Sequence, residues 1–425
     1  MMDAHGPVAL CSVMTAFPTL DEARALDAAD PLRARRADFA LPEGLIYLDG
    51  NSLGALPRRT AGAVADLVTR QWGEHLIASW NSHGWIDAPA RLGARIANLV
   101  GAAPHEVIVA DSTSANIFKL AVAACRARPG RRTILSEPGN FPTDLYVASG
   151  VAQTLGIALR TVPAEALVDA IDEDTAVVLL THVHYKSGQR HDMAAITAAA
   201  QARGALTLWD LSHSAGAVAV DLNGSNADLA VGCGYKYLNG GPGAPAFLYV
   251  AERHHGLLES PLSGWMGHAA PFAFDDAYAP APDIRRFLCG TPPIVAMAAL
   301  EAGIACFDGV TMAELETKSA ALCDLFIAGV EARCAGHGFT LITPREAGHR
   351  GSHVSFAHDE AFAICQALIA RGMVGDFRAP EVLRMGFTPL YTRFEDVWRA
   401  VDILGDVMDV RAWDDPQFRV RGAVT

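Results

Sequence analysis

The chain has 425 residues, of which 51% are hydrophobic, and its formal net charge at pH 7 is −13. It is too long for one simple core, so a large domain and a smaller one are expected. The acidic balance and the scattered arginines leave no basic stripe, which excludes nucleic acid as the main partner but leaves small anionic ligands possible.

The cysteines and the N-terminus indicate the compartment. The eight cysteines form no C-x-x-C pair, which disfavours zinc and a disulfide framework and fits a reducing cytoplasm. The apolar stretch at residues 7–17 has no Lys or Arg before it, so it lacks the positive segment of a secretory signal. No run of about 18 apolar residues is present, so no bilayer span is expected. We therefore expect a soluble cytoplasmic enzyme.

The first hundred residues predict a helical lead-in, a turn and two helices. Residues 1–45 place apolar side chains at helical spacing. The stretch YLDGNSLGALP, residues 47–57, predicts a short strand followed by a Gly/Asn/Pro turn. Residues 60–100 contain two helical patterns that are separated by NSHGWIDAP.

From residue 105 onward, short apolar runs alternate with alanine-rich helices. HEVIVA predicts a strand and SANIFKLAVAACRA a helix, and the alternation continues through RTILS, TAVVLLTHV, ALTLWDLSH, ADLAVGCGY and APAFLYV. Such β-branched runs between helices are typical of a mostly parallel sheet that is covered by helices. The sequence therefore predicts an α/β fold for its larger part.

After about residue 300 the pattern changes to longer helices, with two strands, SHVSF and VLRMGF. This change predicts a second, smaller α+β domain at the C-terminus. We expect an N-terminal segment, residues 1–60, that packs on the small domain, a large domain over residues 61–300 and the small domain over residues 301–425.

The surroundings of one lysine, Lys236, indicate a chemical role for its amine. Only four of the 34 Lys and Arg residues are lysines, and Lys236 lies between two tyrosines in GYKYLNGGPG, where glycines let the backbone approach a ligand. A lysine amine attacks a carbonyl only when it is deprotonated, and burial favours that state. Asp210 ends an apolar strand, where ligands bind in α/β sheets, and could pair with the ring nitrogen of pyridoxal phosphate (PLP). The residues alone leave a Schiff-base lysine and a structural buried lysine about equally open.

Two further stretches supply parts of a candidate site. DSTSANIF, residues 111–118, follows a strand and opens a helix, so its hydroxyls and free N–H groups face an anion, although an ordinary helix cap explains them as well. NFPTDLY, residues 140–146, places an aromatic ring, a hydroxyl and a carboxylate together on a predicted loop. Phe141 would there stack on a planar heterocycle, or belong to the core.

These stretches form part of an ordered set. YLDGNSLG, DSTSANIF, NFPTDLY, HYKSGQRHDM, WDLSHSAGA, GYKYLNGGPG, SGWMGH, CGTPP and RMGFTPLYTRF follow one another across residues 47–394. Together they closely resemble the kynureninase family, PLP enzymes of fold type I in the aspartate-aminotransferase superfamily. The resemblance implies a PLP-binding large domain with a seven-stranded sheet. It also implies hydrolytic Cβ–Cγ cleavage of L-kynurenine to anthranilate and L-alanine, a step of tryptophan catabolism, in a cytoplasmic homodimer with sites at the subunit interface.

The resemblance also implies roles for single residues. Lys236 would carry the Schiff base, Asp210 would pair with the pyridine nitrogen, and Tyr235 would help to hold the phosphate and to move a proton. The other cofactor-binding residues would be Thr113, Ser114, Phe141, Thr143, Asp144, Thr181 and His213, together with Trp265 and Thr291 from the second subunit.

Two residues would bind the substrate. Arg384 would hold the α-carboxylate as a bidentate fork, a task for which lysine is a poor substitute. Trp85, in NSHGWIDAP, would face the aryl ring of the substrate. Tryptophan at that position and threonine at 291 resemble the members that prefer kynurenine over 3-hydroxykynurenine, because an indole face offers no acceptor for a ring hydroxyl.

A metal-dependent hydrolase is one alternative. THVHYKSGQRHD places His182, His184, His191 and Asp192 after a strand, and two imidazoles at a strand end can bind zinc. A barrel hydrolase would need further ligands at later strand ends, where only His213 is well placed. Hydrogen-bonding and surface histidines explain the pattern better, so we expect no metal.

Another fold type I enzyme, an aminotransferase or a cysteine desulfurase, is a second alternative. A desulfurase needs a nucleophilic cysteine on a mobile loop and usually stacks a histidine on the ring where Phe141 stands, and Cys233 and Cys289 look like small apolar fillers. A ligand-binding relic of the fold is a third alternative. Such a relic would have no reason to retain Lys236, Asp210 and Arg384 together.

Overall fold

The computed structural model describes residues 17–422 and divides into two compact units. The larger unit comprises residues 56–185 and 190–308, and the smaller unit comprises residues up to 55, residues 186–189 and residues from 309 onward. The expected breaks lie after residues 60 and 300, whereas the units change after Ala55 and Asp308. Most of the apolar stretch at residues 7–17, and Cys11 within it, lie outside the described residues.

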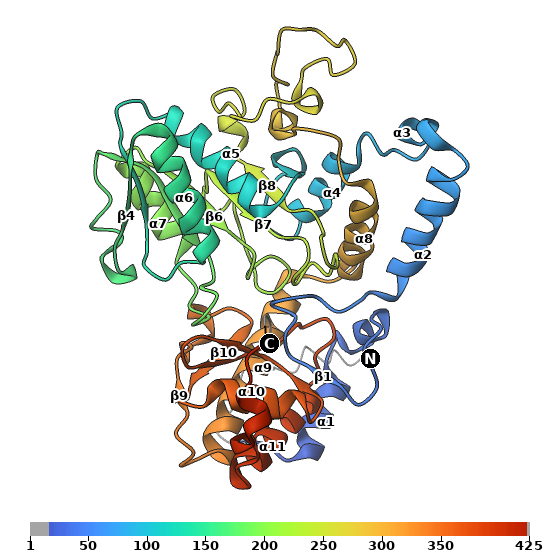
Figure 1. The fold of residues 1–425 in the computed structure, drawn as a ribbon, viewed down its shortest axis with the longest axis vertical. Helices are drawn as coiled ribbons and strands as arrows, with labels where there is room; N and C mark the ends of the chain where they lie inside the picture. The colour runs from blue at the N-terminus through green and yellow to red at the C-terminus, as the bar shows by residue number, and fades with distance from the viewer. Residues whose placement is uncertain (1–16, 423–425) are drawn as a thin grey trace, which may run out of the picture. The chain divides into compact units, whose positions relative to one another are not determined.

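A seven-stranded sheet organises the larger unit, in the order β2-β8-β7-β6-β5-β3-β4 (Figure 1). Its strands are β2 (Val107–Val109), β3 (Thr133–Ser136), β4 (Ala158–Thr161), β5 (Thr175–Thr181), β6 (Leu206–Asp210), β7 (Leu229–Gly232) and β8 (Phe247–Val250). Neighbouring strands from β4 to β7 are parallel, and β8 is antiparallel to both β7 and β2. The prediction of a mostly parallel sheet is thereby confirmed.

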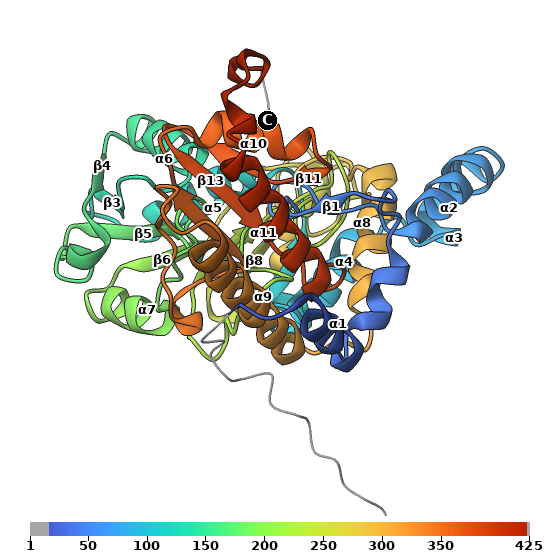
Figure 2. The ribbon, with the colours of Figure 1, turned by 90° about the horizontal axis from the view of Figure 1, so that it is seen from below.

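Helices cover both faces of this sheet. They include α5 (Thr113–Arg126), α6 (Pro142–Leu155) and α7 (Met193–Ala202), and Figure 2 shows α6 and α7 on opposite sides of the strands. The alternation of side chains along β6 explains the arrangement. Leu206 and Leu208 join a core with side chains of α5 and α6, whereas the indole Nε1–H of Trp209 donates to Thr197 of α7 at 3.3 Å. The strand is therefore apolar on both faces.

A second group of helices lies beside the other part of the sheet. It comprises α2 (Arg58–Asp66), the short α3 (Ser79–Ser82), α4 (Ala88–Ala97) and α8 (Ile294–Ile304). Helix α4 packs on β2 and on α8, and α2 packs on α8. Helices α2 and α4 correspond to the two helical patterns predicted for residues 60–100, and both pack on α8.

The prediction of a loop over residues 140–146 is wrong beyond Phe141. Pro142 begins α6, and Phe141 is its N-cap residue. Proline suits the first helical position because its fixed φ matches the helix and its missing N–H is not needed there. Asp144 lies in the first turn, where a carboxylate is favoured by the helix dipole. The aromatic and acidic side chains of this stretch are therefore held by a helix.

The smaller unit is built on an antiparallel sheet of order β12-β13-β10-β9. Its strands are β9 (Thr340–Leu341), β10 (His353–Ala357), β12 (Asp376–Arg378) and β13 (Val382–Gly386), and a separate parallel pair joins β1 (Ile46–Tyr47) to β11 (Met373–Val374). The helices are α1 (Leu20–Ala29), α9 (Met312–Arg333), α10 (Ala361–Ile369) and α11 (Phe394–Asp409). The α+β character predicted for this region is confirmed.

The core of the smaller unit joins its helices to its sheet. Phe326 of α9 lies 5.6 Å, between ring centroids, from Phe387 and packs on Phe356 of β10. Helices α9 and α11 lie side by side (Figure 2). The N-terminal helix α1 belongs to the same unit, because the Asp27 carboxylate accepts the first free N–H groups of α11, from Phe394 and Glu395, at 2.7 and 2.9 Å.

No single helix between residues 17 and 422 is long and apolar enough to cross a membrane, although one bent pair of consecutive helices passes that test by length and composition alone. The seven cysteines in the described part of the chain are all free thiols.

Candidate active site

Three predicted residues meet at the carboxyl ends of neighbouring parallel strands. Thr181 ends β5 and lies directly beside Asp210, which ends β6. Lys236 follows four residues after Gly232, where the next strand, β7, ends. Because parallel strands all finish at the same edge, the fold gathers these side chains in the crevice where α/β sheets bind ligands.

The amine of Lys236 is enclosed by polar and aromatic groups. The residue is only 8% exposed, and its Nζ lies 3.1 Å from Nε2 of His213. The same Nζ lies 5.5 Å from the ring centroid of Phe141 and 5.8 Å from that of Tyr235. A planar ligand bonded to this amine would therefore have an aromatic side chain close by, as the sequence predicts for Phe141.

Two buried carboxyl groups face this lysine. Oδ1 of Asp210 accepts two hydrogen bonds from Ser212, from the backbone N–H at 2.8 Å and from the hydroxyl at 2.6 Å. Burial raises the pKa of Asp210, against the opposing effects of Lys236 and Ser212. Burial and the neighbouring Asp210 raise the pKa of Asp144 well above its ordinary value. Two such carboxyls favour a ligand that brings a positive or proton-bearing nitrogen.

Several buried oxygens in this crevice have no hydrogen-bond partner among the described residues. They are both carboxyl oxygens of Asp144 and the hydroxyl oxygen of Thr181. Buried polar atoms are rarely left unpaired, so these oxygens indicate a bound polar group. The donor set fits PLP, since an amine for its carbonyl, an aromatic face for its ring and buried carboxyls for its nitrogen are all present.

The predicted phosphate residues lie at the start of a helix. Ser112 caps α5 with its hydroxyl oxygen, which accepts from the N–H of Ala115 at 3.3 Å. Thr113 and Ser114 occupy the first turn of this helix. The first N–H groups of a helix have no partner within it, and they carry the positive end of its dipole. Thr143 lies in the corresponding first turn of α6.

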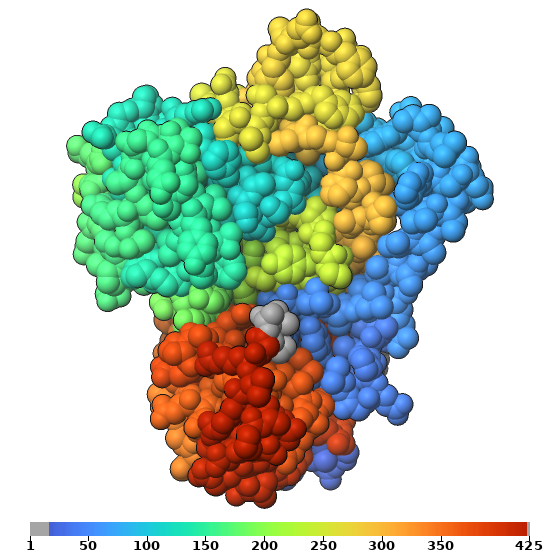
Figure 3. All heavy atoms as spheres, viewed as in Figure 1, coloured from blue at the N-terminus to red at the C-terminus, as the bar shows by residue number. Residues whose placement is uncertain are grey.

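Trp265 and Thr291 are exposed in the larger unit. Trp265 is 37% exposed and packs edge-to-face on Phe272, with ring centroids 5.8 Å apart. Thr291 is exposed shortly before α8 begins at Ile294. The segment after Trp265 projects from the surface of this unit (Figure 3), and its Phe272 is 62% exposed. Within residues 17–422, neither Trp265 nor Thr291 makes a hydrogen bond or a ring contact with Lys236.

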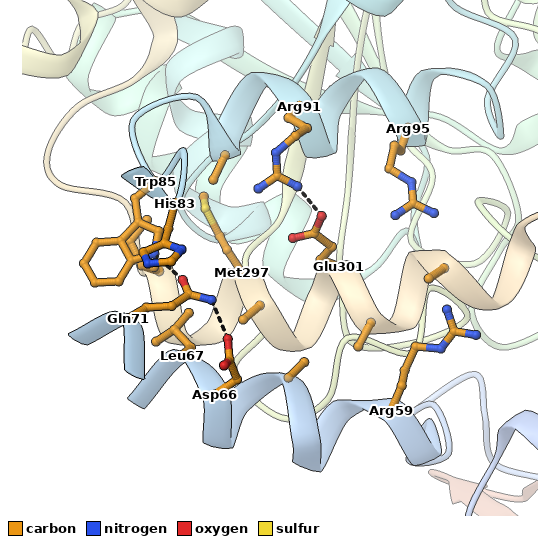
Figure 4. Close-up of a pocket in the computed structure, with 16 residues that line it drawn as sticks. Arg59, Asp66, Leu67, Gln71, His83, Trp85, Arg91, Arg95, Met297 and Glu301 are labelled. Atoms are coloured by element: carbon orange, nitrogen blue, oxygen red, sulfur yellow. Dashed lines mark hydrogen bonds and ion pairs between the residues drawn. The ribbon is translucent and has the colours of Figure 1, made fainter. Parts of the chain in front are cut away.

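Trp85 lines a cavity of about 420 Å³ between α2, α4 and α8 (Figure 4). Its indole Nε1–H donates to the side-chain oxygen of Gln71 at 2.9 Å, and Met297 lies on the facing helix. Trp80 packs edge-to-face on Trp85, with ring centroids 5.9 Å apart. None of the residues lining the cavity belongs to the group around Lys236.

Arg384, in the smaller unit, is 1% exposed, and its neighbours were not predicted as site residues from the sequence. Its Nε donates to Oδ1 of Asp376 at 2.8 Å, and its Nη2 donates to Oδ2 of the same carboxylate. Nη2 also donates to the hydroxyl of Ser52 at 3.1 Å, and the side-chain amide of Asn51 lies 3.0 Å from both nitrogens. Asn51 and Ser52 lie in the YLDGNSLG motif, which was the only sequence signal for them.

The histidines of the metal alternative bind three different partners. Nδ1 of His182 lies 2.9 Å from the hydroxyl of Ser214, and burial lowers the pKa of His182 to about 3. Nε2 of His184 lies 2.7 Å from the carbonyl oxygen of Gly139, and Nε2 of His191 lies 2.9 Å from the Glu137 carboxylate. Over residues 17–422 no three His, Cys, Asp or Glu side chains are grouped as a metal site.

The two cysteines considered for a desulfurase are not activated. Burial raises the pKa of the Cys233 thiol, and it also raises the pKa of the Cys289 thiol. A thiol is a good nucleophile only as its thiolate, so both cysteines lack the electrostatic setting of a reactive cysteine.

Sequence comparisons agree on one family. Residues 315–404 match the model of the kynureninase C-terminal domain. A kynureninase of Burkholderia mallei is 54% identical over 415 residues, which cover 96% of this chain and all of that protein. A kynureninase of Pseudomonas fluorescens is also 54% identical, over 414 residues with the same coverage.

Solved structures of other enzymes share the fold. An apo cysteine desulfurase from Thermococcus onnurineus superposes with a TM-score of 0.75 at 20% identity, covering 89% of this chain and 98% of its own. A C-DES variant with glycine covalently linked to its PLP cofactor superposes with a TM-score of 0.74 at 19% identity, covering 87% of this chain and 99% of its own. At such identities the likeness extends to the fold alone.

Proposed function

This chain belongs to the kynureninase family, PLP-dependent hydrolases that cleave L-kynurenine to anthranilate and L-alanine, and we propose that Lys236 is its cofactor-binding lysine. The observation that carries this assignment is the setting of the Lys236 amine. It lies beside the His213 imidazole and the Phe141 ring, and it interacts with two buried carboxyls, Asp144 and Asp210, whose pKa values burial raises in spite of the lysine.

The cofactor, when bound, supplies a carbonyl for the substrate amine and a ring that withdraws electrons from the substrate Cα. Asp210, whose Oδ1 is kept in place by Ser212, would pair with the protonated ring nitrogen. Lys236 would remove the Cα proton of the substrate and later return a proton, with His213 at 3.1 Å from its amine. Water would add to the γ-carbonyl of the substrate, so that cleavage of the Cβ–Cγ bond releases the aryl fragment as the carboxylic acid anthranilate. Tyr235, whose pKa is raised by burial, would remain protonated and deliver a proton to Cβ.

The remaining cofactor residues follow from their positions. Thr113 and Ser114 offer N–H and hydroxyl donors to the phosphate at the start of α5. Thr181 and Asp144 bring buried oxygens without partners among the described residues, and Thr143 lies in the first turn of α6 beside Asp144. These positions support the larger unit as the proposed cofactor-binding part of the chain, and Arg384 is the residue that we propose for the substrate carboxylate.

A homodimer would complete the site. Trp265 and Thr291 are exposed and make no hydrogen bond or ring contact with Lys236 among the described residues, so a second copy of the chain is the natural acceptor for them. The acidic composition and the free thiols of the described cysteines support a cytoplasmic location for this dimer.

Trapping the cofactor tests the central assignment. The holoenzyme is reduced with borohydride, digested and analysed by mass spectrometry. We expect the pyridoxyl group on the peptide that contains Lys236, while the peptides of Lys119, Lys186 and Lys318 serve as internal controls. Lys236→Ala should lose the visible cofactor band and the release of fluorescent anthranilate. A label on another lysine would refute the assignment.

A preference for L-kynurenine over 3-hydroxykynurenine is proposed from Trp85, whose apolar face would meet the unmodified ring. The measurement is kcat/KM for both substrates in the wild type, in Trp85→His and in Trp80→His. We expect the ratio to move toward 3-hydroxykynurenine in Trp85→His alone. A shift that occurs only in Trp80→His would assign the aryl-facing position to Trp80, which packs on Trp85.

A further inference from the structure

Arg384 shares one face of a two-stranded ladder with two other charged side chains. In the antiparallel pairing of β12 with β13, Asp376 lies directly opposite Arg384, and Arg378 lies opposite Val382. Residues two apart on a strand point to the same face, so Asp376 and Arg378 both lie on the side of Arg384. The register of the sheet therefore brings one carboxylate and two guanidinium groups together.

Asp376 fixes the orientation of Arg384. Its two oxygens accept from Nε and Nη2, so the carboxylate lies along one edge of the planar guanidinium. Both residues are 1% exposed. The charge of Arg384 holds the pKa of Asp376 below its usual value in spite of burial. A bidentate pair sets both the distance and the plane of the arginine, which a single contact cannot do.

Arg378 binds the same carboxylate, at the oxygen Oδ2 that also accepts from Nη2 of Arg384. Its Nη2 donates to Oδ2 of Asp376 at 2.6 Å and to the hydroxyl of Ser52 at 3.2 Å. The hydroxyl of Ser52 donates in turn to Oδ2 of Asp376 at 3.0 Å. The side chain of Arg378 is 37% exposed, unlike those of the buried pair.

The charges of this cluster do not balance. Arg384 and Asp376 alone would form a neutral pair, which attracts an anion weakly. With Arg378 added, two guanidinium groups face the Asp376 carboxylate, and the cluster carries one positive charge while the neighbouring Asp49, whose pKa burial raises to about 7, is protonated. A second carboxylate, supplied by a ligand, would complete two matched pairs in a buried setting where unpaired charge is costly.

We propose that Asp376 and Arg378 are positioning residues for the substrate α-carboxylate. Asp376 holds the plane of the Arg384 guanidinium, and Arg378 offsets the charge of Asp376 so that Arg384 still attracts an anion. This inference rests on the proposed role of Arg384 in substrate binding. If Asp376 and Arg378 formed only a structural ion pair, their loss would not change the preference of the enzyme for a ligand with a carboxylate.

The test compares two ligands that differ only in the carboxylate. The PLP-loaded enzyme is titrated with L-alanine and with L-alaninamide, and binding is followed by the change in the visible cofactor spectrum. We expect the wild type to prefer L-alanine and Arg378→Gln to lose about tenfold of that preference, which corresponds to about 1.4 kcal/mol. Arg378→Lys, which keeps the charge, should recover most of it.

Kinetics with L-kynurenine provide a second readout. Arg378→Gln and Asp376→Asn should raise KM while kcat stays within about twofold, because the reacting groups around Lys236 are unchanged. An unaltered preference and an unaltered KM in Arg378→Gln would overturn the inference, even if the buried Asp376→Asn fails to fold. A wild type without preference for L-alanine would overturn it as well. A wild type that prefers L-alanine but releases no anthranilate would refute the proposed reaction and leave the carboxylate site standing.

Discussion

Asp49 is the residue whose ionisation bears most directly on this carboxylate site. Burial and the nearby Asp376 raise the pKa of Asp49 to about 7, against the lowering effects of Ser52, Arg384 and Arg378. Tyr47, Tyr391 and Cys365 lie close enough to interact with the same charges, and burial raises the pKa of each of them, so they remain neutral in this range. Asp49 is therefore the group near Arg384 that changes charge around neutral pH.

We predict that KM for L-kynurenine rises as pH increases through about 7, because ionised Asp49 competes with the substrate carboxylate for Arg384. Asp49→Asn should remove that rise. The free energy of unfolding should also decrease as pH rises. Because the pKa of Asp49 is raised in the folded state, that state binds the proton more tightly than the unfolded state between pH about 4 and 7. Stability should fall with pH over that window in the wild type and not in Asp49→Asn, as measured by thermal unfolding. Parallel pH profiles of KM in both proteins would contradict the prediction.

Ser212 is predicted to tune Asp210. Its hydroxyl donates to Oδ1 at 2.6 Å, a bond to a charged group that is worth about 1.5 kcal/mol or more. Ser212→Ala should raise the pKa of Asp210 and weaken its hold on the ring nitrogen, so we expect kcat to fall about tenfold with little change in KM. Ser214→Ala is the matched control, because Ser214 is also buried but contacts His182 instead. Equal losses in both variants would indicate a general packing effect.

At the residue scale, candidate site residues could be predicted from the sequence where a side chain lies at the end of a strand. They could not be predicted where a side chain reaches the site through the pairing of two strands. Thr181, Asp210 and Lys236 follow apolar runs that are visible in the sequence. Asp376 becomes a partner of Arg384 only through the antiparallel register of β12 and β13, which no local pattern encodes. The unpaired oxygens of Asp144 likewise appear only when burial and neighbours are known.

At the scale of elements, one of the missed strands and the misplaced helix have simple causes. Strand β4 is exposed at both ends and forms the edge of its sheet, so it lacks the apolar run that marked the other strands. Helix α6 begins inside a stretch that was predicted as a loop, because Phe141–Pro142 carries both a turn signal and a helix-start signal. Interior strands, which are apolar on both faces, were the most readily predicted.

Alanine substitutions at two glycines test the packing around the strand and the helix that contain them. A Cβ added at Gly386, the end of β13, would lie 1.8 Å from the side chain of Asn51, whereas one added at Gly150, exposed within α6, would meet nothing within 4 Å. We predict that Gly386→Ala destabilises by about 1–3 kcal/mol through overpacking and raises KM by displacing Asn51 from Arg384. Gly150→Ala should stabilise by roughly 0.5–1 kcal/mol, since glycine is unfavourable inside a helix. Denaturant unfolding measures both, and a stabilised Gly386→Ala would contradict the described packing.

At the scale of the whole molecule, the proposed dimer predicts complementation between inactive chains. Lys236→Ala removes the lysine of one subunit, and Trp265→Ala removes a group proposed to reach the other subunit. In a symmetric dimer mixed at random, each mixed pair rebuilds one intact site, so we expect about a quarter of the wild-type activity. Mixing should be done under conditions that allow subunit exchange, with anthranilate release as the measurement. Activity that stays at the level of the separate variants would place both residues in the same chain's site or outside it.

The burial of lysine has a practical consequence for handling the protein. Lys119, Lys236 and Lys318 are 0%, 8% and 3% exposed, and Lys186 is half-buried, so none of the four side-chain amines stands out on the surface. Lys119 and Lys318 are further held by Asp111 and Asp30, each at 2.7 Å. Amine-directed dyes, cross-linkers and coupling resins should therefore label these lysines poorly. Free pyridoxal phosphate should for the same reason add little at the other three lysines, so that the cofactor content of a purified sample reports on Lys236, the proposed cofactor-binding lysine.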